Sequence, residues 1–577
     1  MKRHIIAIFA LVAITCSCDI TRLPEDSVTP PSYFKTEEDF RLWSNAFYTQ
    51  FSSADDLAGL NADDVIDNNV QDCIKGSRSA ATENWSWTQL RNINYMLEKS
   101  DQCPDPAIRK RWCAVGYFFR AYFYFVKVRR YGDVPYYDRT IGSADEELLR
   151  KARDDRGYVM YRVMQDFDRA AADLPTAKDV ANVNKWTALA FKSRAALYEG
   201  TFRKYHGIRD TLVDGTLISA EWFLEQAADA AWQLISSGRY SLAQGKDIYR
   251  DIFVAEDANT DEFILARVYG DILAQNVRHN STGEKLGFTR RFMNHYLLAD
   301  GRSISERAGY ETELFADEVK GRDPRLAQTV YCGASKVYGD IPDYMGSVTG
   351  YQPIKFESIK TKNSSGKGTF DFPLMRLAEV YLNYAEAKAE LGTLTQTDLD
   401  KSLNLIRTRV GMPKLSMDKA NQNPDPLMVE YYPNIDKGAF KGVILEIRRE
   451  RTVELVMEGH RQWDMFRWKE GSMMVNHDEP YLGVYFPGTG LYDMDGDGKK
   501  DLEIYSDTKT GSVSVFRKLD VDIVLDGKSS GRIIAYPNVD YVWNEDRDYL
   551  WPIPADQRVL NHNLSQNPGW EDGLVLE

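Results

Sequence analysis

Residues 444–470, ILEIRRERTVELVMEGHRQWDMFRWKE, constrain this chain most, because charges and aromatic side chains share one predicted helix. The stretch has no Gly or Pro before Gly459, and apolar residues recur at the three- and four-residue steps of an α-helix. Charges of both signs fill the positions between and could form a ladder of salt bridges in solvent. Trp463, Phe466 and Trp468 are interleaved with them, so at least one face must be buried. We therefore expect Arg–carboxylate pairs that orient this helix on a larger scaffold.

The same stretch contains Glu458, His460 and Asp464, which together suggest an active site. The many Arg neighbours would make His460 less basic, so we interpret the triplet as structural. The chain has no GxSxG motif, and none of its seven His residues forms HExxH. Its 86 acidic residues make carboxylate pairs too common to identify a glycosidase. The sequence thus predicts a protein that is not an enzyme; a surface polysaccharide hydrolase is the weaker alternative.

The N-terminus, MKRHIIAIFALVAITCSCDI, is predicted to be a targeting segment. Two basic residues precede an apolar run, Ile5 to Ile14, that is too short to cross a bilayer. Small residues before Cys18 resemble a bacterial lipoprotein signal, in which residues 1–17 are removed and Cys18 is acylated; Cys16 is the second choice. Several acyl chains would anchor the chain stably to a membrane. The alternative is an ordinary cleaved signal in which Cys18 has no role.

Charge and cysteine content exclude other classes of protein. The net charge of -14 argues against nucleic acid as a partner, because phosphate binding needs a basic stripe. After Cys18 the remaining thiols form no CxxC pair, so we expect neither a zinc module nor a disulfide scaffold. Cys103 and Cys113 could pair in an oxidising compartment.

Helical patterns dominate the first half of the chain. Pro- and acid-rich residues 18–34 suit an extended tether, and a helix is predicted to begin with Thr36 as its N-cap. Four further helices are expected, each ended by Gly or Pro: 111–130, 158–174, 185–199 and 219–237. Long paired helices with small residues at packing positions indicate a tetratricopeptide-like superhelix over 35–248.

The second half, 249–577, is predicted to be richer in loops and partly β. Between 249 and 370 the content of Gly, Asn, Ser and Tyr rises. Helices are expected again at 373–391 and 398–410, followed by the stretch at 444–470. Hairpins are predicted around Tyr485 and Val513. We expect 35–577 to form one structural unit that is mostly α.

Several passages together resemble the SusD/RagB family of outer-membrane nutrient-binding lipoproteins. They occur in the family's order and include RAYFYFVKVRRYGDVPYY (120–137), KWTALAFKSRAALYEG (185–200), GRDPRL (321–326), RLAEVYLNYAEAKAELG (376–392), IRTRVGM (406–412), ERTVELVMEGHRQWDMFRW (450–468) and LWPIPADQRVLNHNLSQNPGW (550–570). One departure is CAVGYFF at 113–119, where the family more often has a charged Glu-Ala-Arg pattern.

The resemblance implies a SusD-like fold and a function. Such proteins capture oligosaccharides on the cell surface of Gram-negative bacteria and close as a lid over a SusC-like TonB-dependent transporter. Some members instead bind peptides, as RagB does, on the same scaffold.

Sugar sites combine aromatic platforms with polar side chains, and the densest such cluster lies between Asn61 and Asn94. The resemblance also places this segment on the ligand-facing surface. We expect Trp85 to be the platform, whereas helical spacing could turn Trp87 and Asn94 inward. The candidate ligand-binding residues are Asp64, Asn84, Trp85, Trp87, Arg91, Asn92, Tyr296, Tyr338 and Tyr344, with Tyr351 beside them. For each of these Tyr residues, burial in the core is the alternative.

A calcium loop is predicted at 493–501, with ligands Asp493, Asp495, Asp497, Asp501 and the backbone carbonyl of Lys499. The spacing matches the first nine places of an EF-hand-type loop, in which Gly498 stands at place 6. Place 12 is Ile504 rather than Glu. The alternative is an acidic turn exposed to solvent.

Overall fold

The computed structural model describes residues 33–58, 62–81, 85–270, 273–274, 285–332, 346–357, 367–435, 438–475 and 481–572. The signal segment, Cys18 and most of the predicted tether therefore lie outside the described residues. Within the described ranges, no helix combines the length and the apolar character needed to span a membrane.

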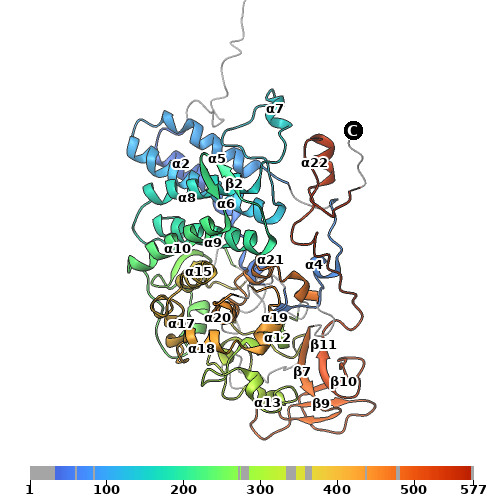
Figure 1. Ribbon diagram of the computed structural model, residues 1–577. Coiled ribbons are helices and arrows are strands. Elements are labelled where there is room, and N and C mark those ends of the chain that lie inside the picture. Colours follow the sequence, from blue (N-terminus) through green and yellow to red (C-terminus); the bar gives the residue numbers. More distant parts are fainter. Residues whose placement is uncertain are drawn as a thin grey trace, which may run out of the picture.

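A stack of long helices forms the scaffold (Figure 1). Successive members pack against one another in the order α5 (Thr88–Lys99), α6 (Pro106–Tyr131), α8 (Arg156–Asp173), α9 (Lys185–His206), α10 (Ala220–Ser236), α15 (Leu377–Glu390) and α20 (Lys441–Glu454). α2 (Glu37–Ser44) covers the end formed by α5 and α6. The expected mostly α, tetratricopeptide-like architecture is confirmed.

Local sequence explains where these helices begin and how closely they pack. Thr36 caps α2 through a reciprocal capping box with Asp39, as its position predicts. Asp105 caps α6 directly before Pro106. The expected end of a helix at Gly200 is wrong, because α9 continues to His206 and ends at Gly207. Gly200 is instead a contact point, where a Cβ atom would lie 2.9 Å from Leu224 on α10.

Short elements make up most of the remaining chain. The short helices are α3 (Ala54–Ala58), α4 (Asp72–Lys75), α7 (Glu146–Leu149), α11 (Ile248–Val254), α12 (Arg290–His295), α13 (Phe315–Glu318), α14 (Leu326–Thr329), α16 (Gln396–Asp400), α17 (Leu403–Arg409), α18 (Met417–Gln422), α19 (Pro426–Tyr431), α21 (Arg461–Arg467) and α22 (Ala555–Leu560). Short segments of 3-10 helix lie at Asn45–Gln50, Ser100–Gln102, Ile304–Glu306 and Gly471–Val475.

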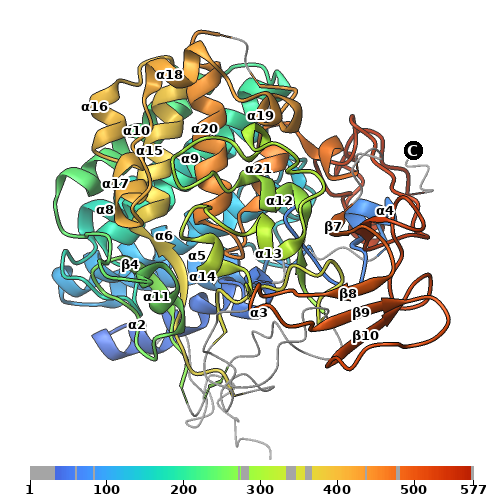
Figure 2. The ribbon, with the colours of Figure 1, turned by 90° about the horizontal axis from the view of Figure 1, so that it is seen from below.

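The strands form small sheets. Antiparallel pairs join β1 (Val65–Ile66) to β5 (Gly287–Phe288), β2 (Thr211–Val213) to β3 (Thr216–Ile218), β4 (Phe263–Arg267) to β6 (Phe372–Arg376), and β7 (Leu482–Phe486) to β11 (Gly531–Ile534). A three-stranded sheet of β8 (Gly490–Tyr492), β9 (Leu502–Tyr505) and β10 (Val515–Lys518) lies at the edge of the molecule, away from the helical stack (Figure 2).

The predicted single helix over 444–470 is wrong. α20 ends at Glu454, α21 begins at Arg461, and Met457 and Gly459 between them have φ of 61° and 79°. Side chains from distant segments bind the carbonyl groups at this end. The Glu454 carbonyl accepts from Arg376 Nη2 (2.7 Å), and the Val456 carbonyl accepts from Lys355 Nζ (2.9 Å). Tertiary hydrogen bonds thus replace the helical ones that the periodicity predicts.

Three other predicted elements differ. Residues 372–376 form strand β6 before α15 begins at Leu377, so the helix expected at 373–391 starts later. The helix expected at 398–410 divides into α16 and α17 at Ser402. The hairpins are also mispredicted: β7 pairs with the distant β11, and β9 pairs with β10 in parallel, whereas the local hairpin is β8–β9.

The charges of α20 belong to a buried ion-pair network. Its ten charged side chains are each at most 5% exposed. Its cations are Lys355, Arg325, Arg376, Arg407 and Arg409, and its carboxylates are Glu262, Asp323, Glu450, Glu454 and Glu458. This matched set connects α20 to β6, to α17 and to the segment around Asp323. The stretch is therefore a buried brace rather than a solvated ladder.

Glu458, His460 and Asp464 are all engaged by this packing. Glu458 binds Arg376 and Lys355, and Asp464 binds Arg451 and Arg467. Burial, with Arg194 and Arg451 nearby, holds the pKa of His460 well below its usual value. Cys103 and Cys113 are free thiols, so the suggested disulfide does not form.

Candidate functional site

A pocket of about 550 Å³ opens between three segments that are distant in sequence. One wall is Trp85, Trp87 and the start of α5, the second is the loop 135–149 that ends in α7, and the third is α22 with the residues after it. The lining residues are Trp85, Trp87, Thr88, Leu90, Arg91, Asn94, Pro135, Tyr137, Arg139, Ile141, Leu149, Gln557, Leu560, Asn561 and Leu564. This volume lies within the roughly 300–1,000 Å³ usual for ligand sites.

Hydrogen bonds hold the second and third walls in place. The buried Asn94 amide donates to the carbonyls of Tyr137 and Arg139, each at 3.1 Å, and so attaches the second wall to α5. Arg120 Nη1 donates to Asn94 Oδ1 (3.2 Å), and Arg120 also makes a bidentate pair with Asp166. The Asn561 amide donates to the Lys151 carbonyl (2.9 Å), which joins the third wall to the second. The pocket is therefore preformed.

Aromatic rings form the floor of the pocket. Trp85 and Trp87 meet edge to face with centroids 5.5 Å apart, and Trp87 meets Tyr137 in the same way at 5.5 Å. Trp85 is only 8% exposed, so it is not the open platform that we expected, whereas Trp87 is half-buried. The apolar side chains of Leu149 and Leu560 are exposed at the rim. This combination of ring faces and polar groups can bind a molecule with both apolar and hydroxylated surfaces.

Lys127 of α6 lies among the same rings. Its ammonium is 5.3 Å from the Trp85 ring centroid, 5.5 Å from that of Trp87 and 5.4 Å from that of Tyr131. In the described part of the chain it makes no ion pair. Burial, with a contribution from Arg130, lowers the pKa of Lys127 to about 7. Among the described residues, the Lys127 ammonium is thus held by aromatic faces.

Of the predicted ligand residues, the structure brings Trp85, Trp87 and Arg91 together in this pocket. Asn92 lies on the same helix but does not line the pocket, and its carbonyl accepts from Trp43 Nε1. Asn84, Tyr338 and Tyr344 lie outside the described residues. Asp64, Tyr296 and Tyr351 are buried elsewhere.

These three buried residues have other surroundings. Asp64 precedes β1 and accepts from the Val65 amide, and burial beside Asp63 raises its pKa to about 7. Tyr296 packs on Phe292 in the core. The Tyr351 hydroxyl donates to Glu318 at 2.8 Å.

Sequence reasoning missed the second and third walls. Tyr137 and Asn561 stand in passages quoted for the family resemblance, but nothing local marks them as neighbours. Asn94 closes the predicted cluster, with a scaffold role as its alternative; it lines the pocket and also holds the loop. The only local signal available was the run of aromatic and amide residues in α5.

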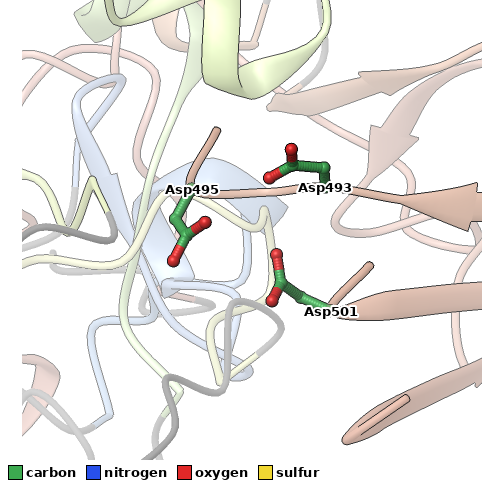
Figure 3. A group of neighbouring side chains, drawn as sticks. All are labelled: Asp493, Asp495 and Asp501. Atoms are coloured by element: carbon green, nitrogen blue, oxygen red, sulfur yellow. The ribbon is translucent and has the colours of Figure 1, made fainter. Parts of the chain in front are cut away.

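The acidic loop between β8 and β9 brings three of its four Asp side chains together (Figure 3). Carboxylate oxygens of Asp493, Asp495 and Asp501 all lie within 4.8 Å of one another. Asp497 instead pairs with Lys499 Nζ at 3.0 Å. Partial burial, with Asp495 and Asp493 nearby, raises the pKa of Asp501, so a cation would relieve this repulsion. Within the described ranges, these three residues form the group that could hold a metal ion.

Comparison with known proteins identifies the family. The sequence model of the SusD family matches residues 244–570, which is more than half of the chain. The chain belongs to the SusD family. The SusD-like protein P38 of Formosa agariphila is 22% identical over 78% of this chain and 88% of that protein. The SusD-like protein P2 of the same organism is 23% identical over 99% of this chain and all of that protein.

Solved SusD structures share the fold. A SusD-like protein from Bacteroides fragilis superposes with a TM-score of 0.67 at 21% identity, over 95% of this chain and all of the other. A second structure from that organism is described as a SusD-like carbohydrate-binding protein. It superposes with a TM-score of 0.67 at 19% identity, over 92% of this chain and 99% of the other. The range that matches the SusD family includes the third pocket wall, whereas the first two walls precede it.

Proposed function

We propose that this SusD protein binds oligosaccharides in the pocket between α5, α7 and α22. The observation that carries the proposal is the joint presence of Trp87 and Tyr137 rings with Arg91 and Gln557 in one preformed recess. Ring faces of sugars stack on aromatic side chains while their hydroxyls bind the polar groups. A related structure described as carbohydrate-binding supports this assignment.

The proposed role is binding without catalysis. Glycoside hydrolysis needs two carboxyl groups across the scissile bond. Among the described residues that line the pocket there is neither Asp nor Glu. Incubation with polysaccharides should therefore release no product. Turnover that a carboxylate substitution abolishes would favour the hydrolase instead.

Affinity electrophoresis against a panel of soluble polysaccharides tests glycan binding. We expect Trp87→Ala to weaken binding about 5- to 30-fold, which corresponds to the loss of about 1–2 kcal/mol of stacking. Trp222→Ala is the matched control, because Trp222 is also half-buried but lies on α10, outside the pocket. Unchanged binding by Trp87→Ala would remove the pocket from the proposal. Binding of peptides, but of no glycan, would favour the RagB-like alternative.

We further propose that Cys18 anchors the protein to the outer membrane and that a SusC-like TonB-dependent transporter receives the ligand. Family membership and the N-terminal sequence support this proposal. Cys18→Ala should move the protein from the membrane fraction to the soluble fraction. Mild detergent extraction of tagged protein should recover a TonB-dependent transporter with it. Membrane retention of the Cys18 variant would contradict the anchor.

Calcium in the acidic loop is a separate proposal, supported by the convergence of Asp493, Asp495 and Asp501. Calorimetric titration with CaCl₂ should give one site, and extracellular modules bind with a Kd of roughly 10⁻⁴–10⁻³ M. Asp501→Asn should abolish the signal. Asp497→Asn is the control and should retain it, because Asp497 pairs with Lys499. Equal losses in the two variants would contradict the assignment of ligands.

A further inference from the structure

The pocket is basic although the chain is acidic. Asp and Glu exceed Lys and Arg by 86 to 72 in the sequence. The charged side chains that line the pocket are nevertheless Arg91 and Arg139, with no carboxylate in the described part of the lining. Both arginines are exposed, so their guanidinium groups are available to a bound molecule.

Neither guanidinium forms an ion pair with a described carboxylate. Within the described ranges, Arg91 and Arg139 make no side-chain hydrogen bond and no ion pair. Two carboxylates near the second wall have other partners: Glu98 accepts hydrogen bonds from the Thr140 amide and hydroxyl, each at 2.6 Å, and Asp138 lies 3.7 Å from Arg162. Glu146 and Glu147 of α7 are exposed and do not line the pocket. On the third wall, Asp556 accepts from the Gln557 amide at 3.1 Å. The donors of both guanidinium groups therefore remain available to a bound anion.

A third cation lies behind the aromatic floor. Lys127 is surrounded by the rings of Trp85, Trp87, Phe123 and Tyr131, without a carboxylate partner among the described residues. When protonated, it adds to the positive potential felt by a group that rests against Trp87. Charges at a concave, partly apolar wall are screened less than charges on an open surface.

We propose that this pocket selects acidic oligosaccharides, whose rings carry carboxylate or sulfate ester groups. The planar guanidinium groups of Arg91 and Arg139 match such anions because each can donate two parallel hydrogen bonds. Trp87 and Tyr137 supply the stacking surface, so a sugar ring and its anionic substituent are recognised together. The inference rests on the proposed glycan binding and adds the chemical class of the glycan.

Matched pairs of polysaccharides test the charge requirement. Polygalacturonate is compared with its methyl ester, and dextran sulfate with dextran, so that each pair shares a sugar backbone and differs in its anionic groups. We expect the acidic member to bind at least about tenfold more tightly, as charge-assisted hydrogen bonds would provide. Its advantage should shrink when NaCl rises from about 0.05 to 0.5 M. The two pairs distinguish carboxylate from sulfate ester as the preferred anion.

Arginine variants locate the effect. Arg91→Gln and Arg139→Gln should each weaken binding of the acidic member about 10- to 100-fold and leave binding of the neutral member unchanged. Arg239→Gln is the control, because Arg239 is exposed, makes no side-chain bond among the described residues and follows α10. Trp87→Ala should weaken binding of both members. Circular dichroism spectra of all variants should match, since the three arginines are exposed.

The possible failures are distinct. Equal or tighter binding of the neutral members overturns the acidic preference but leaves glycan binding intact. If both arginine variants still bind the acidic polysaccharides as wild type does, the attraction is a general one to polyanions, which also overturns the inference. Binding of polyglutamate as tightly as of acidic glycans overturns selection for sugars. No binding of any glycan, acidic or neutral, refutes the proposed function itself.

Discussion

Glu454→Gln tests whether the buried network braces the C-terminal part of the molecule. The Glu454 carboxylate accepts from Arg376 Nη1 at 2.8 Å, from Arg325 Nη1 at 2.9 Å and from Arg409. All of these side chains are at most 2% exposed. Removal of the charge therefore leaves three guanidinium groups short of a partner, in a place that water cannot reach.

The cost follows from this geometry. Hydrogen bonds to charged groups contribute about 1.5–3 kcal/mol each, and removal of one partner of a buried ion pair costs about 3–5 kcal/mol. Because Arg376 and Arg409 keep Glu262, and Arg325 keeps Asp323, we expect a loss of about 4 kcal/mol in the free energy of unfolding. Urea unfolding followed by tryptophan fluorescence and by circular dichroism measures this loss.

The pH dependence and a surface control complete the test. The surrounding guanidiniums hold the pKa of Glu454 far below its usual value. Its stabilising contribution is present above about pH 4.5 and is lost as pH falls, so wild type and variant should converge in acid. Glu38→Gln breaks the exposed Glu38–Arg41 pair and should change stability much less. A loss for Glu454→Gln as small as for this control would refute the brace.

Two further predictions concern groups near the ligand segment. Asp64→Asn should stabilise the protein at pH 8 by at most about 4 kcal/mol. Burial raises the pKa of Asp64 to about 7, so the ionised carboxylate destabilises the folded state at that pH. Thermal unfolding should show this gain vanishing at pH 4, and a gain independent of pH would contradict it. Lys127→Met should stabilise the protein at pH 6, because burial lowers the pKa of Lys127 to about 7. The cost of burying the protonated Lys127 in the wild type falls as pH rises from 7 towards 10.5. Urea unfolding should therefore show a smaller stability gain for Lys127→Met at pH 10 than at pH 6, and a larger gain at pH 10 would argue against this account.

The helices of the scaffold could be predicted because their signals are local. Thr36 with Asp39 specifies the start of α2, as predicted. α6 starts at Pro106 with Asp105 as its cap, before the start at 111 that the apolar pattern alone predicts. Where the prediction failed, a distant group decided the outcome. The apolar periodicity predicted that α20 continues past Glu454. The side chains of Arg376 and Lys355 bind the backbone carbonyls there, and the helix ends. Gly200 was expected to end a helix, yet it is the contact point between α9 and α10.

The sequence by itself determined the family, the mostly α architecture and an aromatic, amide-rich segment around α5 suited to a ligand. Only the tertiary structure decided what that segment faces. Asn561 and Lys151 are 410 residues apart in the chain, yet their hydrogen bond joins two pocket walls. That Arg91 and Arg139 line one pocket, without an ion pair among the described residues, is also visible only in the folded chain. Helix periodicity and capping act within a few residues, whereas a pocket and its charge depend on which remote segments fold together.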